Sequence, residues 1–272
     1  MNKLKEVIIR EVWTHNLKDE FNLIQQVIHQ HPFISMDTEF PGVIHVSKIG
    51  CRYDRSSREY SCLKANVDAL KLIQIGLTLS DSNGNLPDFG SNKSYVWEFN
   101  FSDFDVNHDP CDQRSINMLR RQGIDFDRNF RDGVDSVHFA ELFLSSRFVY
   151  DKSLVWITFS GAYDFGYLVK ILTRKNLPNS LEDFLNVVQG LFGRNVYDMK
   201  HMMKFCNSLF GGLESVATIL NVRRLVGKSH QAGSDSLLTW LAFKKMMEIY
   251  FKTETEAPKL AGVLFGLEIE AY

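Results

Sequence analysis

Residues 33–42 read Phe33-Ile-Ser-Met-Asp37-Thr-Glu39-Phe40-Pro41-Gly42, an apolar run that ends in two acids and a Pro-Gly pair. Its apolar start predicts a buried strand, which Pro41-Gly42 ends. Side chains two positions apart on a strand leave the same face, so Asp37 and Glu39 should stand together at the edge of the core. Such a pair repels and takes up protons unless a cation intervenes, and its oxygens suit Mg²⁺. The alternative is that the pair only caps the following turn.

Outward from this strand, the pattern predicts one mixed α/β domain over residues 1–272. Residues 43–66 have no clear period and are interpreted as an irregular excursion. A turn-rich segment at 81–88 predicts an antiparallel hairpin between its two flanking strands. We therefore expect a central sheet with helices on both faces. The other strands are expected at 70–79, 94–100, 154–159 and 196–198, and the helices at 16–30, around 116–120 and 139–143, and at 163–175, 199–207, 213–220 and 234–250.

The composition limits the possible functions. The chain has 272 residues, 44% of them hydrophobic, and a formal net charge of -2. A protein that grips nucleic acid mainly through bulk charge should be more basic, so a phosphate ligand would need a local patch or bound metal ions. The four cysteines have no metal-site spacing, which favours reduced thiols in an intracellular protein. No segment approaches the ~20 apolar residues that span a membrane, and the expected location is the nucleus and cytoplasm.

Three further residues could complete an acidic cluster. Asp164 follows the strand at 154–159 and starts a helix, so it is either a helix cap or a ligand delivered to the same sheet edge as Asp37. Asp235 lies at the start of the last long helix, and it is likewise either a helix cap or a ligand. His230 precedes it across a glycine-containing loop, where a histidine is either solvated or placed to take a proton from water. The order Asp-x-Glu, Asp, His, Asp indicates an apparatus for two-metal phosphodiester hydrolysis.

These segments resemble the DEDDh branch of 3′–5′ exonucleases, which share the ribonuclease H-like fold. More closely, the chain is similar to the Caf/Pop family of poly(A)-specific exoribonucleases, the deadenylase subunit of the CCR–NOT complex. The resemblance extends from about residue 11 to 266. The matching segments are Glu11-Val-Trp13, Met36-Asp-Thr-Glu-Phe-Pro-Gly42, Asn66-Val-Asp68, Tyr163-Asp-Phe-Gly-Tyr-Leu168, Gly211-Gly-Leu213 and His230-Gln-Ala-Gly-Ser-Asp-Ser-Leu-Leu-Thr239.

The resemblance implies a site, cofactors and partners. Two divalent cations, Mg²⁺ or Mn²⁺, would be held by Asp37, Glu39, Asp164 and Asp235, with Asp37 between them. Glu39 and Asp235 would hold the ion that activates water, Asp164 the ion at the leaving oxygen, and His230 would be the general base. The substrate would be poly(A) RNA, released as 5′-AMP. The implied partners are a NOT scaffold protein and a leucine-rich-repeat nuclease of the CCR type.

One position departs from the family pattern, and the RNA contacts rest on weaker signals. Relatives commonly carry His where this chain has Ser160, which bears on the surroundings of Asp164. Aromatic rings that flank catalytic residues can stack bases, and basic residues before His230 can contact phosphates; each set is equally compatible with core packing or a solvated loop. The candidates for substrate binding are Phe40, Tyr163, Arg223, Arg224 and Lys228.

Two other functions compete with an active poly(A) ribonuclease. A DEDDh exonuclease acting on DNA or structured RNA is disfavoured by the matching blocks outside the catalytic residues. A scaffold subunit that bridges a second nuclease to the NOT protein is the alternative from another functional class. All five catalytic positions are filled, which gives no reason for a purely structural role, although both roles can coexist.

Overall fold

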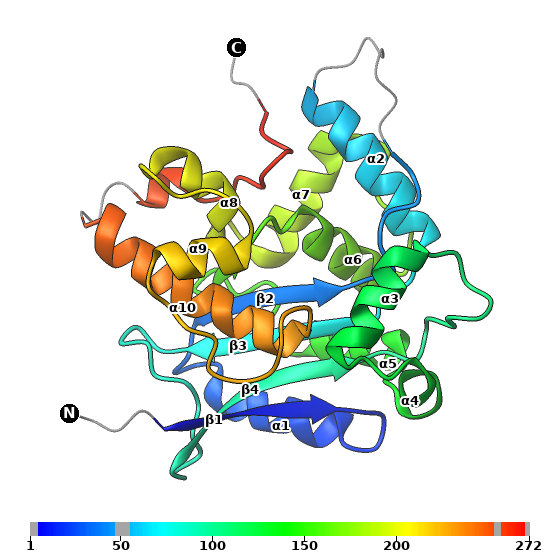
Figure 1. Ribbon diagram of the computed structural model, residues 1–272, viewed down its shortest axis with the longest axis horizontal. Helices are drawn as coiled ribbons and strands as arrows, with labels where there is room; N and C mark the ends of the chain where they lie inside the picture. Colours follow the sequence, from blue (N-terminus) through cyan, green and yellow to red (C-terminus); the bar gives the residue numbers. More distant parts are fainter. Residues whose placement is uncertain (1–4, 47–54, 253–256, 270–272) are drawn as a thin grey trace.

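The computed structural model describes residues 5–46, 55–252 and 257–269. Within these ranges, strands form a six-stranded sheet in the order β1-β4-β3-β2-β5-β6 (Figure 1). β3 runs antiparallel to both β2 and β4, so the predicted hairpin is confirmed, while β1, β5 and β6 pair in parallel with their neighbours. The strands are β1 (Glu6–Val12), β2 (Phe33–Glu39), β3 (Gln74–Ser80), β4 (Lys93–Asn100), β5 (Val155–Thr158) and β6 (Val196–Asp198).

Helices follow most of the strands in the described part of the chain. Several begin at a residue whose side chain accepts a backbone N–H, as Asp112, Asp125, Asp135 and Ser180 do for α3, α4, α5 and α7. The helices are α1 (Leu17–Val27), α2 (Arg55–Ala69), α3 (Gln113–Gln122), α4 (Phe126–Asp132), α5 (Ser136–Ser145), α6 (Ala162–Thr173), α7 (Leu181–Phe192), α8 (Met199–Met202), α9 (Leu213–Ile219) and α10 (Ala232–Tyr250), with 3₁₀ turns at Met203–Phe205 and Ala257–Leu260.

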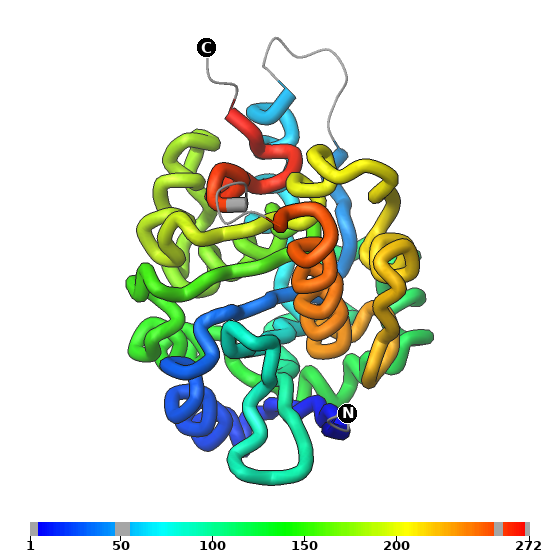
Figure 2. The backbone as a smooth tube through the Cα atoms, turned by 90° about the vertical axis from the view of Figure 1, so that its left-hand side faces the viewer, coloured from blue at the N-terminus to red at the C-terminus, as the bar shows by residue number. Residues whose placement is uncertain are grey.

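Helices cover both faces of the sheet, as expected from the sequence. The turned view of Figure 2 shows α10, in orange, on one side of the strands and α1, in dark blue, on the other. The alternation along β2 explains the two cores, because Ile34 and Met36 are fully buried with α1, α5 and α6, whereas Phe33 packs with α10. Odd-numbered side chains of β2 therefore face α10.

The sequence-based prediction needs correction at α2 and β1, and it also did not include α7. The interpretation of residues 43–66 as irregular is wrong, since Arg55–Ala69 forms α2, while residues 47–54 lie outside the described residues. Tyr60, Leu63 and Val67 do follow helical spacing and are buried, but the polar residues between them hid this signal. The edge strand β1 was not predicted, because most of its side chains are only half-buried and its pairing with β4 is set by tertiary structure.

Two further features of the described residues concern the cysteine thiols and the lengths of the apolar helices. Cys111 and Cys206 form no disulfide, the Cys62 thiol donates a hydrogen bond to the His45 carbonyl, and Cys51 lies outside the described residues. Among the residues described, no helix combines the length and apolar character needed to cross a membrane.

Candidate active site

Asp37 and Glu39 lie on the face of β2 that α10 covers. Ser35 shares this face, and its hydroxyl donates a hydrogen bond of 2.8 Å to the carbonyl of Ser236 on α10. Glu39 is buried and Asp37 is partly exposed. The strand thus presents two carboxylates, one above the other, to the first turn of α10.

Gly76 allows the start of α10 to lie directly on the sheet at this point. Gly76 on β3 pairs with Asp37 on β2. A Cβ atom at Gly76 would lie 1.8 Å from the carbonyl oxygen of Ala232 and 2.5 Å from the amide nitrogen of Gly233. No other residue type leaves room for this approach, which brings Asp235, near the start of α10, to the carboxylates of β2.

Replacing Gly76 with Ala is expected to lower both stability and activity. The added methyl group meets backbone atoms of α10, so the helix must move away from β3, which costs about 1–3 kcal/mol as overpacking does elsewhere. Thermal unfolding and the rate of RNA cleavage would measure the two effects. Gly190→Ala is the control, because nothing lies within 4 Å of the new Cβ atom; a Gly76→Ala protein with wild-type stability and rate would contradict this account.

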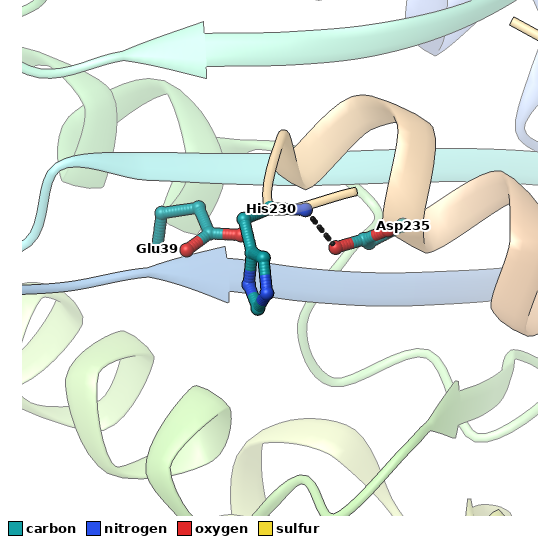
Figure 3. A group of neighbouring side chains, drawn as sticks. All are labelled: Glu39, His230 and Asp235. Carbon is teal, nitrogen blue, oxygen red and sulfur yellow. Dashed lines mark hydrogen bonds between the residues drawn. The ribbon is translucent and has the colours of Figure 1, made fainter. Parts of the chain in front are cut away.

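His230 stands in the loop before α10 with its side chain exposed. Its backbone has a φ of 59°, in the left-handed region, and its N–H donates to Asp235 Oδ2 over 2.8 Å (Figure 3). Single ligand atoms of Glu39, His230 and Asp235 all lie within 4.8 Å of one another. The loop therefore turns the imidazole back toward the carboxylates, where it can act as a base or as a metal ligand.

Asp164 reaches the site from the other side of the sheet. β5 lies beside β2 and runs parallel to it, so the carboxyl ends of both strands meet at one edge. Asp164 is the third residue of α6, which starts just after β5, and is buried. Its Oδ1 accepts a hydrogen bond of 2.5 Å from the hydroxyl of Thr38, which lies between Asp37 and Glu39 in the sequence.

Burial raises the pKa values of the four carboxyl groups, and repulsion within the cluster raises those of Asp37 and Glu39 further. Desolvation raises the pKa of Asp37 and of Glu39 well above the usual range, and the charges of Asp235 and Asp164 raise both further. Burial raises the pKa of Asp164 to about 7, against the hydrogen bond from Thr38. Burial also raises the pKa of Asp235, against the charge of Arg224. A bound cation would relieve this repulsion.

The metal-free protein is therefore expected to lose stability as the pH rises from about 5 to 8. Carboxyl groups with raised folded-state pKa values bind more protons in the folded than in the unfolded chain, so the free energy of unfolding falls over this window. Each unit of pKa is worth ~1.4 kcal/mol, and each kcal/mol shifts the Tm of a chain this size by about 2–4 °C. The Tm at each pH would be measured by calorimetry.

Divalent cations provide the control for this pH dependence. Mg²⁺ at pH 8 should restore the lost Tm, whereas NaCl of equal ionic strength should not, because screening reaches buried charges poorly. A Tm that is the same at both pH values, and unmoved by Mg²⁺, would show that the cluster is not under electrostatic stress.

The three basic candidates differ in their surroundings. Arg224 is half-buried and donates to Asp235 Oδ1 over 2.5 Å, and it also pairs with Glu214. Arg223 and Lys228 are exposed. Arg224 thus balances one carboxylate of the cluster, while Arg223 and Lys228 have their side chains open to solvent. Contact of any of the three with RNA phosphates stays a prediction.

The two aromatic candidates stack on each other. The rings of Phe40 and Tyr163 have centroids 5.1 Å apart and planes 14° apart, and Phe40 also contacts Tyr167. Both candidates are partly buried and pack against the larger core. Stacking of either ring on an RNA base stays a prediction.

The sequence analysis did not identify two buried acids that bind backbone N–H groups of the segments around the site. Asp198, the fully buried last residue of β6, accepts the N–H groups of Ser160 and Gly161, which lie just before α6, and that of Phe265. Its charge raises the pKa of Asp164, so Ser160, whose N–H binds Asp198, adjoins the surroundings of Asp164. Glu98, on β4, accepts the N–H of Gly233. Each lies in an ordinary strand sequence, so no motif marks either one.

The donor set at this edge fits divalent cations. Four carboxylates from β2, α6 and α10 converge with one exposed imidazole, and hard oxygen donors of this kind are the ligands that Mg²⁺ and Mn²⁺ prefer. Such an arrangement can bind a phosphate group through cations and orient a water molecule beside it.

The family model described as "CAF1 family ribonuclease" matches residues 12–142 of this chain. A probable CCR4-associated factor 1 homolog 10 of Arabidopsis thaliana is 50% identical over 269 residues, which cover 98% of this chain and 95% of the relative. The chain belongs to the CAF1 ribonuclease family. The poly(A) ribonuclease pop2 of Schizosaccharomyces pombe, another relative, is 40% identical over 259 residues, covering 95% of this chain and 75% of that protein.

Solved structures agree with the family and with the fold. The S. pombe Pop2p structure with Mg²⁺ and Mn²⁺ bound has a TM-score of 0.88 at 40% identity, covering 95% of this chain and 99% of that chain. The yeast CAF1 structure co-crystallised with the NOT1 MIF4G domain gives a TM-score of 0.77 at 32% identity, covering 97% and 99%. E. coli exonuclease I, at 13% identity and a TM-score of 0.53 over 79% of this chain and 40% of that one, shares the fold alone. The ribonuclease H-like fold that the sequence predicts is thereby confirmed.

Proposed function

We propose that this CAF1-family protein is a metal-dependent 3′–5′ exoribonuclease that removes poly(A) tails from mRNA and releases 5′-AMP. The observation that carries the proposal is the convergence of Glu39, Asp235 and His230 beside Asp37 and Asp164. The relative that acts on poly(A), pop2 of S. pombe, covers 95% of this chain at 40% identity. Its structure binds Mg²⁺ and Mn²⁺, which fits the all-carboxylate donor set present here.

Each residue has a defined task in the proposed reaction. Asp37, Glu39, Asp164 and Asp235 would hold two divalent cations, which supply the positive charge that stabilises the phosphorane-like transition state when bound. His230 would take the proton of the attacking water, because its ring is exposed and lies within 4.8 Å of carboxylate oxygens of Glu39 and Asp235. Thr38 orients the Asp164 carboxylate through its hydroxyl. Arg224 holds Asp235 in place.

The proposed setting is the CCR–NOT complex. The yeast CAF1 relative was crystallised with the NOT1 MIF4G domain, and the Arabidopsis relative is named a CCR4-associated factor. We therefore expect a NOT scaffold protein and a leucine-rich-repeat nuclease of the CCR type as partners, in the nucleus and cytoplasm. This favours a scaffolding role as the second candidate function, which is compatible with catalysis by the same chain.

The test uses a 5′-labelled RNA with a 3′ oligo(A) tail, incubated with the protein and Mg²⁺ or Mn²⁺. Matched tails of U and of C, and a DNA version, run beside it. A ladder that shortens from the 3′ end, fastest on A, is the expected result. If a folded protein shortens no tail with either metal, the catalytic proposal fails, and retention of a NOT scaffold in a pull-down would then leave the bridging role.

A further inference from the structure

The first turn of α10 carries no cap of its own. The first N–H groups of an α-helix have no partner within the helix and need an acceptor from elsewhere. At α10 the residue before the helix, Gln231, gives no side-chain cap. Its side chain instead accepts from the Lys228 N–H and donates to the Gln122 carbonyl. The helix that supplies Asp235 is thus capped by other parts of the chain.

Two buried side chains of the sheet provide these acceptors. Gln74 Oε1, on β3, accepts the Ala232 N–H over 3.3 Å, and Glu98 Oε2, on β4, accepts the Gly233 N–H over 2.9 Å. Both are buried, with 4% and 7% of their surface exposed. The Gln74 amide donates to Asn100 Oδ1 over 2.7 Å, which fixes the orientation of its oxygen toward the helix. A carboxylate at a helix N-terminus is also favoured by the helix dipole.

Gly233 packs closely against side chains of β4 and β1. A Cβ atom at Gly233 would lie 3.0 Å from the Cβ of Glu98 and 3.1 Å from Cγ2 of Ile9. Gly233 stands two residues before Asp235 and three after His230, so any shift here moves both. Glu98 is therefore connected to the proposed metal site through a single hydrogen bond and a single helical turn.

We propose that Glu98, assisted by Gln74, is a positioning residue that holds the first turn of α10 on the sheet and thereby sets Asp235 and His230 at their distance from Glu39. What matters is the acceptor oxygen that receives the Gly233 N–H, not the negative charge. A further acid beside an acidic cluster lowers stability. We therefore attribute the role of this contact to the position that it gives the first turn of α10. This inference rests on the proposed metal-dependent function.

The test compares Glu98→Leu with Glu98→Gln. Leu fills a similar space without an acceptor, whereas Gln keeps a carbonyl oxygen for the Gly233 N–H. Mn²⁺ binding, followed by calorimetry without substrate, should weaken about 10–100-fold in Glu98→Leu, as for other residues that orient metal ligands. Glu98→Gln should stay within about threefold of the wild type, on the same reasoning. Glu11→Gln is the control, since Glu11 pairs with Glu98 in register on β1 but is exposed and forms its ion pair with Arg128.

A second variant keeps the inference testable if Glu98→Leu does not fold. Gln74→Leu removes the neighbouring acceptor and should weaken Mn²⁺ binding in the same direction. Wild-type affinity in a folded Glu98→Leu or Gln74→Leu protein would overturn the inference, as would a Glu98→Gln protein as impaired as Glu98→Leu. If the wild type itself binds no Mn²⁺, the proposed function fails instead, so the two failures are distinguishable.

Discussion

Replacement of Asp37 with Ala is expected to abolish RNA hydrolysis while leaving the fold intact. The Asp37 carboxylate lies among those of Asp235, Asp164 and Glu39, all of which raise its pKa. Without it, the site loses one of the four carboxylates that would hold the cations. In the metal-free protein the same change removes a desolvated like charge, so the free energy of unfolding should stay equal or rise.

The measurement pairs a cleavage assay at saturating Mg²⁺ with thermal unfolding in EDTA. Asp19→Ala is the control, because Asp19 is exposed on α1, across the sheet from α10. A substituted protein that still cleaves at near-normal rates would refute the two-metal proposal. Loss of both cleavage and stability would instead mean that Asp37 supports the fold.

Most of the strands and several of the helices were predictable because their patterns are local. Residues 33–39 combine an apolar run with a Pro-Gly stop, and β3 and β4 flank a turn-rich segment, so the order of the central strands followed from the sequence. β1 was not predictable, since an edge strand whose side chains are mostly half-exposed acquires its identity from pairing with β4. α2 was missed although Tyr60, Leu63 and Val67 carry a helical spacing.

The carboxylates were predictable as candidates because they stand where strands end and helices begin. The contacts that hold them were not, because these join residues far apart in the sequence. In the sequence, Gly76 looks like any glycine in a strand. Only the structure shows that a Cβ atom at this position would lie 1.8 Å from the carbonyl oxygen of Ala232 on α10. Asp198 and Glu98 are buried acids whose partners are backbone N–H groups of other segments. Sequence patterns indicate which functional groups are present, whereas tertiary packing determines which of them are in contact.

His230→Ala is expected to lower the cleavage rate by roughly 10²–10⁴ while leaving metal affinity nearly unchanged. The exposed imidazole lies within reach of Glu39 and Asp235, yet the hydrogen bond to Asp235 comes from the backbone N–H of His230, which alanine retains. The loop and the carboxylate should therefore stay in place, and only proton transfer from water is lost. Single-turnover cleavage and Mn²⁺ calorimetry measure the two quantities on the same preparation.

Added imidazole distinguishes a lost base from a damaged site. A small molecule that occupies the vacated space can accept the proton, so part of the rate should return, and it should rise with the concentration of neutral imidazole. His138→Ala is the control, because His138 is exposed on α5, on the opposite face of the sheet. Calorimetric loss of Mn²⁺ binding in His230→Ala would make His230 a ligand instead, since its ring lies within 4.8 Å of both carboxylates and either role is compatible with that distance.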